Sequence, residues 1–382
     1  MPEPTPPASG PTIHWVGTGL SSGSGLTMLA GRGHPLVLWG RTEEKAAALA
    51  DRLGVPVAAS RALQLPALAA ELAPGDVLVS MLPAAWHAEL LEICLQTGAH
   101  FACSSYTSPQ LAALAEQART AGLVVLTEAG LDPGIDHLLA HQLIAEALAK
   151  VGAGPATVSL TSYCGGVPAV ANDFRYLFSW APQGVLTALL SPARYLDGGE
   201  VTEVAKPWHA VRPHSVNGED FEVYPNRDSV PFIEQYGIPS GWEVESFVRG
   251  TLRLPGWRQA WQPVFDQLES RGSDCVPELA GELAQRYPMT PTDRDRVVLT
   301  VELDVRAEHG ATFGAGRVLD LIGDDAEAAM ARCVSAPLAI GVCRLLDGAL
   351  PAGLNRAAET ADEAGVWLDM LSEHFAIDIV GV

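Results

Sequence analysis

The sequence predicts an α/β protein whose amino-terminal half forms a Rossmann-type, doubly wound parallel sheet. Three observations lead to this expectation. Short apolar segments alternate with helical patterns, a glycine-rich loop follows the first apolar segment, and strict apolar–polar alternation becomes common only in the second half. Alternating strands and helices are typical of parallel sheets covered on both faces. We expect two domains in this chain of 382 residues.

The first half contains five apolar segments that are short enough to be buried strands. They span residues 13–16, 36–39, 77–81, 101–103 and 124–126. Helical patterns occupy the gaps: one begins over residues 26–30, one follows Thr42, and two span residues 85–96 and 109–121. Thr42 is a suitable N-cap, and Glu43 and Glu44 suit the positive end of its helix.

A glycine loop separates the first predicted strand from the first predicted helix. It reads Gly17-Thr18-Gly19-Leu20-Ser21-Ser22-Gly23-Ser24-Gly25. Glycines there allow a tight turn and a close approach of the backbone to a pyrophosphate at the helix start. The spacing departs from G-x-G-x-x-G, because Ser22 holds the third position. Strand, loop and helix in this order favour a dinucleotide site, and a glycine turn without a ligand is the alternative.

The end of the second predicted strand bears on the choice of cofactor. An acid there holds a ribose 2′-hydroxyl, whereas an arginine accommodates a 2′-phosphate. The residues are Gly40-Arg41-Thr42, with no acid before Glu43. We therefore favour NADP(H), with NAD(H) as the alternative. Arg41 as a solvated surface residue and Thr42 as a helix cap are the structural alternatives.

Composition excludes several classes of protein. The net charge is −21, which argues against nucleic acid as a partner. Six cysteines lie far apart without a C-x-x-C pair, which is typical of reduced thiols in the cytoplasm. The proline-rich residues 1–11 predict a disordered tail rather than a signal peptide. No apolar run approaches the roughly 18 residues of a membrane span, so no membrane is expected as a partner.

A polar segment over residues 127–137 follows the strand at residues 124–126. It reads Thr127-Glu128-Ala129-Gly130-Leu131-Asp132-Pro133-Gly134-Ile135-Asp136-His137 and leads into a long helical pattern. Ligands bind beyond the carboxyl ends of the strands in open α/β sheets, so this segment is a candidate for the active site. Asp132 is the first choice for an acid–base role, and an N-cap for the next helix is its structural alternative.

Asp136, His137 and His141 form the pattern D-H-x-x-x-H. Two histidines at this spacing share one helix face, as zinc ligands can. A zinc site needs three or four protein ligands, however, and no second cluster in the sequence supplies the rest. We expect no metal and interpret Asp136 as an acid at the helix start.

The second half predicts fewer helices. Residues 157–163 are typical of a strand, and residues 296–306 and 312–321 predict a hairpin with its turn at 308–310. Residues 326–350 form a long, mostly apolar helical pattern, which commonly packs back on a first domain. Substrate carboxylates need fork-like partners. Arg227 and Arg249 are candidates for that role, with salt bridges to Asp228 or Glu245 as the alternatives.

Four blocks of residues resemble the saccharopine dehydrogenases, in particular the glutamate-forming, NADP-linked type. They are Ser104-Ser105-Tyr106 with Ser108-Pro109; residues 130–137; residues 162–168 with Tyr176, Phe178-Ser179-Trp180 and Gly184-Val185-Leu186; and residues 224–229 with 249–253. Together with the glycine loop they follow the family's order over roughly residues 13–260.

The resemblance implies an enzyme that joins glutamate to 2-aminoadipate 6-semialdehyde through an imine, which NADPH reduces to saccharopine, or that runs the reverse reaction in lysine metabolism. It also implies an inserted α/β substrate domain and carboxy-terminal helices that return to the dinucleotide domain. Asp132, Tyr106 and Cys164 occupy the family positions near the reacting nitrogen. Tyr106 as a packed aromatic and Cys164 as a small buried side chain are the structural alternatives.

Two residues depart from the family pattern. Leu177 stands where a lysine is usual and Gln183 where an arginine is usual. Arg175 would share a face with Leu177 on a strand and compensate for the lost charge. The departures leave open an imine reductase of the carboxynorspermidine or opine type with a different amine substrate. A non-catalytic NADP-binding protein is a further alternative, against which the retention of Asp132, Tyr106 and Cys164 argues.

The sequence thus predicts three sets of site residues and four segments. The expected cofactor-binding residues are Gly17, Gly19, Leu20, Ser21, Ser22, Arg41, Thr42, Ser80, Met81, Leu82, Ser104, Ser105, Leu131 and Asp132. The expected substrate-binding residues are Tyr106, Asp132, Cys164, Arg175, Phe178, Arg227 and Arg249, of which Asp132, Tyr106 and Cys164 are the catalytic candidates. The segments are the tail at 1–11, a dinucleotide domain at 12–135, a substrate domain at 136–325 and helices at 326–382. A cytoplasmic enzyme with a small amino-acid substrate is expected, and a homodimer is left open.

Overall fold

A computed structural model describes residues 10–290 and 292–382. Within them the chain forms two compact units. The first consists of residues up to 135 with 331–358, and the second of 136–330 with 359–382. The tail expected at residues 1–11 lies, up to residue 9, outside the described residues.

The first unit is built on a parallel sheet, and its strands are almost wholly buried because helices cover it. Among the described residues the sheet has seven strands in the order β15-β6-β5-β4-β1-β2-β3. The expected α/β fold with a doubly wound parallel sheet is confirmed. The strands are β1 (Ile13–Val16), β2 (Leu36–Gly40), β3 (Ala59–Ala62), β4 (Val77–Ser80), β5 (His100–Cys103), β6 (Val124–Leu126) and β15 (Gly353–Asn355).

The helices of this unit follow the predicted patterns, except for a helix at Leu65–Glu71 that was not predicted. Thr42 caps α2 as expected, since its hydroxyl accepts a hydrogen bond from the N–H of Lys45 at 3.4 Å. The glycine at the start of α1 packs directly on α12. The helices are α1 (Gly25–Gly31), α2 (Glu43–Leu53), α3 (Leu65–Glu71), η1 (Ala84–Trp86), α4 (His87–Thr97), α5 (Pro109–Thr120) and most of α12 (Ala329–Leu346).

Two strands of this sheet were not predicted. β3 is short and only partly buried, so it lacks the apolar run that marks a strand in a sequence. β15 has three residues and pairs with β6 in parallel from more than 200 positions further along the chain, with Asn355 opposite Leu126. β15 lies at the edge of the sheet because the chain returns to the first unit's sheet after α12.

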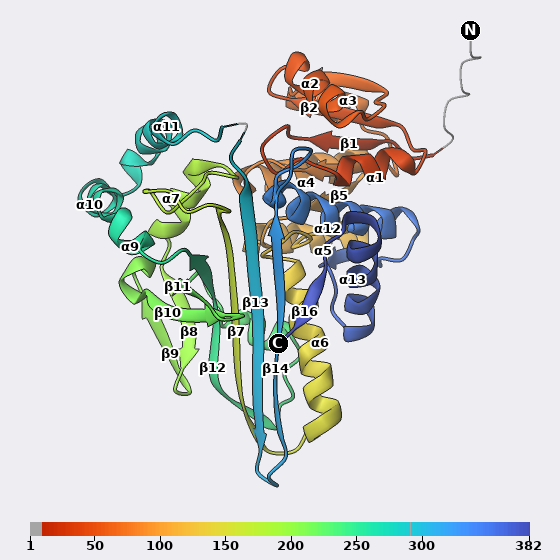
Figure 1. Cartoon of the computed structure of the whole chain (residues 1–382). Coiled ribbons are helices and arrows are strands. Elements are labelled where there is room, and N and C mark those ends of the chain that lie inside the picture. Colours follow the sequence, from red (N-terminus) through yellow and green to blue (C-terminus); the bar gives the residue numbers. More distant parts are fainter. Residues whose placement is uncertain (1–9, 291) are drawn as a thin grey trace. The chain divides into compact units, whose positions relative to one another are not determined.

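The second unit is built on a mixed sheet with long central strands (Figure 1). Its main path among the described residues runs β10-β11-β12-β7-β13-β14-β16, and β8 and β9 extend it beside β12. The predicted hairpin is confirmed, with Leu299 of β13 opposite Leu319 of β14. The strands are β7 (Ala156–Pro168), β8 (Ala193–Asp197), β9 (Glu200–Val204), β10 (Arg212–Val216), β11 (Glu219–Pro225), β12 (Trp242–Arg253), β13 (Asp295–Ala307), β14 (Thr312–Ile322) and β16 (Ile379–Gly381).

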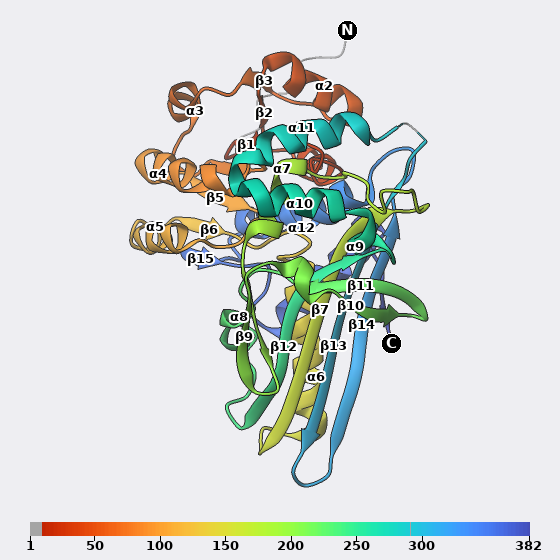
Figure 2. The same ribbon diagram turned by 90° about the vertical axis from the view of Figure 1, so that its left-hand side faces the viewer.

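Helices border this sheet on two sides. α6 runs along the long strands (Figure 2), where Glu146 forms an ion pair with Arg317 of β14 at 2.5 Å. An aromatic cluster that includes Trp257, Trp261 and Phe265 packs several of the other helices. The helices are α6 (Ile135–Val151), α7 (Pro182–Leu190), η2 (Pro207–Ala210), α8 (Pro231–Gln235), α9 (Trp257–Ala260), α10 (Gln262–Arg271), η3 (Gly272–Cys275), α11 (Val276–Arg286) and α13 (Ala361–Phe375).

The carboxy-terminal segment does not stay together as expected for residues 326–382. Most of α12 belongs to the first unit, whereas residues 359–382 belong to the second. There β16 pairs with β14, with Val380 opposite Val318. The apolar alternation of β14 leaves an open strand edge, and β16 pairs with that edge. The expectation that the whole segment packs on the first unit is therefore wrong.

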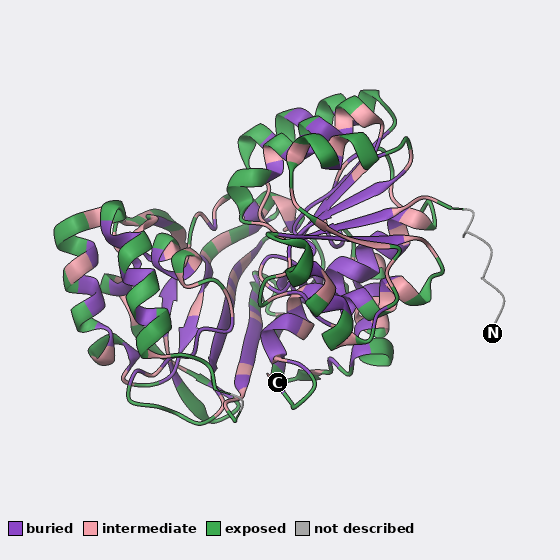
Figure 3. Ribbon diagram, turned by 90° about the horizontal axis from the view of Figure 1, so that it is seen from above, coloured by how far each residue is buried: buried purple, intermediate pink, exposed green. Residues whose placement is uncertain are grey.

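Burial follows the two sheets (Figure 3), where the strands are mostly purple and the outer faces of helices green. α12 is long and apolar enough to cross a membrane by length and composition, with mean hydropathy 1.5, which corrects the expectation that no segment reaches this limit. However, 78% of it is buried inside the fold. Such burial is typical of a core helix.

Candidate active site

Tyr106 and Asp132 meet at the carboxyl edge of the first sheet. Tyr106 lies in the loop after β5, and Asp132 lies in the segment after β6. The phenolic O–H of Tyr106 donates a hydrogen bond to Oδ1 of Asp132 at 2.5 Å. Both side chains are partly exposed. The alternative of Asp132 as an N-cap is not supported by its position, because α6 begins at Ile135 and Gly134 precedes it.

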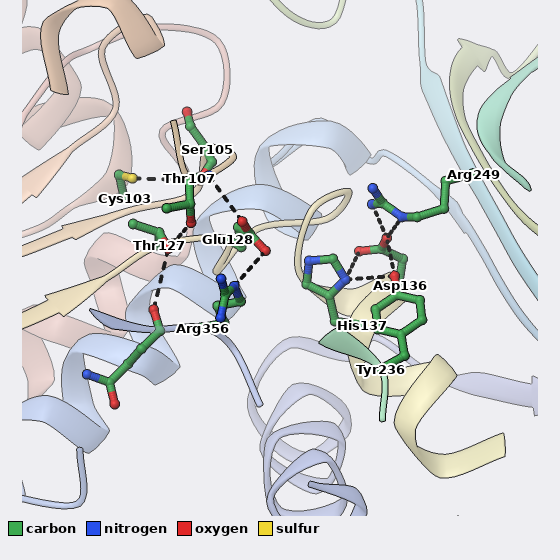
Figure 4. A network of polar contacts seen from close by, with 11 residues as sticks. Cys103, Ser105, Thr107, Thr127, Glu128, Asp136, His137, Tyr236, Arg249 and Arg356 are labelled. Atoms are coloured by element: carbon green, nitrogen blue, oxygen red, sulfur yellow. Dashed lines mark hydrogen bonds and ion pairs between the residues drawn. The ribbon is translucent and has the colours of Figure 1, made fainter. Parts of the chain in front are cut away.

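Glu128 holds the loop that carries Tyr106, and the sequence analysis assigned it no role. Its N–H donates to the carbonyl of Ser105 at 3.0 Å, and its Oε1 accepts from the N–H of Thr107 at 3.1 Å. The carboxylate is buried and forms an ion pair with Arg356 at 3.3 Å (Figure 4). An acid two residues after the buried strand β6 was the available signal, but its partner Arg356 follows β15.

The glycine loop has the shape that a dinucleotide site needs. Gly17 has a φ of +121°, and a Cβ there would lie 3.0 Å from Cβ of Met81. A Cβ at Gly19 would meet no atom within 4 Å among the described residues. The backbone therefore turns tightly against β4 and leaves open space at Gly19, which fits the approach of a pyrophosphate.

The loop's other residues divide into two groups. Leu20 is exposed and Ser21 partly exposed. Ser22 is buried, and its hydroxyl donates to the carbonyl of Gly17 at 3.2 Å. Ser22 therefore holds the loop through its side chain, and only its backbone could face a cofactor. The missing third glycine of the fingerprint is explained by this internal hydrogen bond.

The remaining expected cofactor residues follow strand ends of the same sheet. Arg41 is exposed directly after β2, as a partner of a 2′-phosphate should be. Ser80 is buried and accepts from the N–H of Leu82 at 3.3 Å, whereas Met81 and Leu82 are partly exposed, as are Ser104 and Ser105. Leu131 is buried. Parallel strands bring these loops to one edge of the sheet.

Cys164 lies in the middle of the second unit's sheet. It stands on β7 opposite Thr251 of β12 and Leu299 of β13. The described cysteines, Cys164 included, are buried and form no disulfides, as expected of reduced thiols. Burial raises the pKa of Cys103 to about 12, so that thiol stays protonated at neutral pH.

Arg249 enters a buried ion pair with Asp136. Its Nε donates to Oδ2 of Asp136 at 3.2 Å, and its Nη2 contacts the same oxygen. Its guanidinium carbon lies 4.0 Å from the centre of the Phe232 ring. The expected alternative, a salt bridge to Glu245, is wrong, since Glu245 pairs with Arg306 at 2.6 Å. That Arg249 holds a substrate carboxylate stays a prediction.

The histidines beside Asp136 take part in the same buried group. His137 Nδ1 lies 2.9 Å from the hydroxyl of Tyr236 (Figure 4), and the ring of His141 contacts the ring of Tyr236 edge-on. In the described part of the chain no group of three or more histidine, cysteine or acidic side chains is arranged to hold a metal ion. The histidines pack on aromatic rings at the start of α6.

Arg175 and Arg227 both adopt a φ of +56° in loops. Arg175 does not lie on a strand, because residues 171–180 form turns and irregular backbone. The prediction that Arg175 shares a strand face with Leu177 is therefore wrong. Arg227 is exposed, and its neighbour Asp228 pairs with Arg194 at 2.6 Å instead.

Phe178 lies near the two residues that differ from the family pattern, Leu177 and Gln183, in the second unit. Phe178 is buried in the aromatic cluster, 6.4 Å from Trp261 between ring centres. Leu177 is also buried, whereas Gln183 is exposed in the first turn of α7. A lysine at position 177 would need a buried partner, so Leu177 suits the apolar surroundings it has here.

Comparison with known proteins decides the family. Residues 13–126 match the model of the Saccharopine dehydrogenase NADP binding domain. Residues 130–377 match the model of the Saccharopine dehydrogenase C-terminal domain. The chain belongs to the saccharopine dehydrogenase family. The first unit of this saccharopine dehydrogenase family member is its NADP-binding domain, and NADP(H) is confirmed as the expected cofactor.

Individual relatives agree with the family. The chain is 41% identical over 206 residues to a saccharopine dehydrogenase [NADP(+), L-glutamate-forming] of Pyricularia oryzae, which covers 52% of this chain and 44% of that protein. It is 36% identical over 262 residues to the protein of the same name from Schizosaccharomyces pombe, which covers 65% and 55%. The aligned part thus spans about half the length of these curated relatives.

Solved structures show the same fold. The apo saccharopine dehydrogenase (L-Glu forming) of Saccharomyces cerevisiae matches with a TM-score of 0.80 and 26% identity, over 98% of this chain and 100% of that chain. A homospermidine synthase of Legionella pneumophila in complex with NAD matches with a TM-score of 0.63 and 12% identity, over 98% and 91%. The second match concerns the fold alone.

Proposed function

We propose that this protein is an NADP-dependent oxidoreductase that acts on the C–N bond of saccharopine. It joins glutamate and 2-aminoadipate 6-semialdehyde, or splits saccharopine in the reverse direction. The observation that carries the proposal is the Tyr106–Asp132 hydrogen bond of 2.5 Å at the carboxyl edge of the NADP-binding sheet. Such an edge is where ligands of open α/β sheets bind.

Bound NADPH would supply a hydride to the imine carbon at this edge. Gly17, Gly19 and the loop after β2 would hold the dinucleotide, with Arg41 at the 2′-phosphate. The chain's own task is to position the imine and to manage charge on its nitrogen. Asp132 carries a carboxylate that stabilises a protonated imine and exchanges its proton, and Tyr106 orients that carboxylate through its hydrogen bond.

Glu128 acts on the site indirectly, by positioning the loop that carries Tyr106. It fixes the backbone at Ser105 and Thr107, on both sides of Tyr106. The ion pair with Arg356 keeps the buried carboxylate compensated. Cys164, Arg227 and Arg249 remain candidates for substrate contacts.

One pair of assays tests the proposal. Saccharopine with NADP, and separately glutamate with 2-aminoadipate 6-semialdehyde and NADPH, are followed by absorbance of the reduced cofactor. Turnover with both sets supports the proposal. Turnover only with other amine and carbonyl pairs would assign the protein to a related imine reductase, as the loss of charge at Leu177 and Gln183 allows. NADPH binding without turnover on a broad panel would make it a non-catalytic binding protein.

A further inference from the structure

The loop after β4 depends on side chains for its conformation. Residues 81–83 connect β4 to η1 at the carboxyl edge of the first sheet. The N–H of Met81 donates to a carbonyl of β1 at 2.8 Å, whereas the N–H of Leu82 donates to the hydroxyl of Ser80 at 3.3 Å. Pro83 has no N–H to donate. Beyond Met81 the loop is therefore held by side-chain contacts with the peptide groups of Leu82.

His87 holds the carbonyl of Leu82. Its Nε2 lies 3.0 Å from that oxygen. A carbonyl only accepts hydrogen bonds, so Nε2 carries the proton in this contact. Burial lowers the pKa of His87 to about 4, which leaves the ring neutral and Nδ1 without a proton. Among the described residues Nδ1 has no hydrogen-bond partner. The single N–H of a neutral ring is thus used on the loop after β4.

The His87 ring has a fixed place in the core of the first unit. It is 2% exposed, whereas residues 83–86 before it are exposed. Its centre lies 5.8 Å from that of the Phe101 ring of β5, which it meets edge-on. The backbone of His87 is the first residue of α4. A buried and rigid anchor therefore stands directly after an exposed turn.

The same loop packs against the glycine turn after β1. A Cβ at Gly17 would lie 3.0 Å from Cβ of Met81 and 3.2 Å from the carbonyl oxygen of Met81. Atoms packed this closely cannot move independently. Gly17 also has a φ of +121°, which favours glycine. The position of the loop after β4 therefore limits the shape of the turn that approaches the pyrophosphate.

We propose that His87 is a positioning residue for NADP(H): its Nε2–H holds the Leu82 carbonyl and thereby sets the loop after β4 against the glycine turn. It acts through Leu82 and Met81 rather than by touching the cofactor. The inference rests on the NADP-binding domain and not on the proposed substrate. A loop that is ordered before binding lowers the cost of binding. Loss of the donor should therefore weaken NADPH and NADH alike, because both contain the pyrophosphate.

Three substitutions at position 87 separate the hydrogen bond from the ring. Glutamine carries an amide N–H at the place of Nε2, the shorter asparagine carries one at the place of Nδ1, and leucine has no donor. Fluorescence titration of the whole protein should show both cofactors weakened about 10-fold in His87→Leu and His87→Asn. His87→Gln should keep both affinities within about twofold.

His100→Leu is the matched control in the same unit. The N–H of Val124 donates to Nδ1 of His100 at 2.9 Å, so this variant also removes a hydrogen bond between a histidine and the backbone. His100 begins β5, and it therefore lies at the end of the strands opposite the cofactor loops. The variant should lower stability but change both cofactor affinities less than about twofold.

Hydrogen exchange of the cofactor-free protein provides a measurement independent of binding. Amides of residues 81–86 should exchange faster in His87→Leu and not in His87→Gln, because only the first variant releases the loop. Should His87→Leu fail to fold, His87→Asn takes its place in both measurements.

Several results would each overturn the inference. They are unchanged cofactor affinity or unchanged exchange in His87→Leu, equal losses in His87→Gln and His87→Leu, a loss for NADPH alone, and an equal loss in His100→Leu. Absence of turnover in the saccharopine assays, together with cofactor binding that depends on the donor at position 87, would overturn the proposed function alone.

Discussion

Tyr106 and Asp132 come from different loops, and single side chains at this sheet edge carry the proposed chemistry. The sequence indicated both residues through resemblance, but their mutual hydrogen bond came from the fold. Glu128 was not identified, because its role depends on contacts with Thr107 and Arg356. At the scale of residues, motifs indicated candidate side chains, whereas contacts with distant partners could not be predicted from the sequence.

We predict that Asp132→Asn and Tyr106→Phe both lower kcat for saccharopine oxidation. The loss of proton exchange at Asp132 should lower kcat by about 100-fold or more. Tyr106→Phe should cost less, because the carboxylate remains and only its orientation is lost. Steady-state kinetics measure both, with Tyr195→Phe on β8 as the control. Wild-type kcat in Asp132→Asn would rule out Asp132 as the proton-exchanging group.

We predict that Arg41→Ala weakens NADPH binding and leaves NADH binding nearly unchanged. Arg41 is exposed beyond β2, and a charged hydrogen bond to a 2′-phosphate contributes about 1.5–3 kcal/mol. Fluorescence titration with each reduced cofactor measures the difference, and NADH serves as the internal control. An equal effect on both cofactors would show that Arg41 does not contact the 2′-phosphate.

Elements of regular structure were predicted best where apolar periodicity was strong. The strands at residues 13–16 and 124–126 agree with the structure, and the hairpin of β13 and β14 agrees within one residue at each end. β3 was missed because it is only partly buried, and β15 because it has only three residues and is defined by its pairing with β6. Arg175 was placed on a strand that does not form. Its φ of +56° instead belongs to a turn, which periodicity cannot indicate.

The contact of α1 with α12 yields a prediction at this scale. A Cβ at Gly25 would lie 2.1 Å from the carbonyl oxygen of Ser335, whereas a Cβ at Gly31, at the other end of α1, would meet nothing within 4 Å. Gly25→Ala should therefore destabilise the protein by about 1–3 kcal/mol. Gly31→Ala should be neutral or stabilise it by up to about 1 kcal/mol. Urea unfolding compares the two variants, and equal effects would show that this helix contact is not tight.

Both units of the molecule bury histidines and an ion pair. In the first unit, burial lowers the pKa of His14 and His100, and lowers that of His87 to about 4. The second buries the ion pair of Asp136 and Arg249. The alternation of strands and helices in the first unit followed from the sequence, but the assignment of the last segments to different units did not.

Acid should therefore destabilise the protein through its first unit. Histidines in the unfolded chain have a pKa of about 6.5. Below that pH they bind protons in the unfolded chain, whereas the buried histidines of the folded unit stay neutral. Between that pH and about 4, His87 should cost up to about 1.4 kcal/mol for each pH unit. Stability thus falls as pH falls through this window. Urea unfolding at several pH values measures the slope of the unfolding free energy against pH, and His87→Gln should reduce this slope. An unchanged slope would show that His87 does not contribute to the loss of stability in acid.

The sequence by itself determined the family, the parallel sheet of the first unit and the glycine loop, and it named candidate residues for the chemistry. These properties depend on local periodicity and on contiguous motifs. The tertiary structure alone decided the partners: Asp132 with Tyr106, Glu128 with Arg356, and Asp136 with Arg249. Burial and pairing of charges depend on which distant segments the fold brings into contact, and one-dimensional patterns do not contain that information.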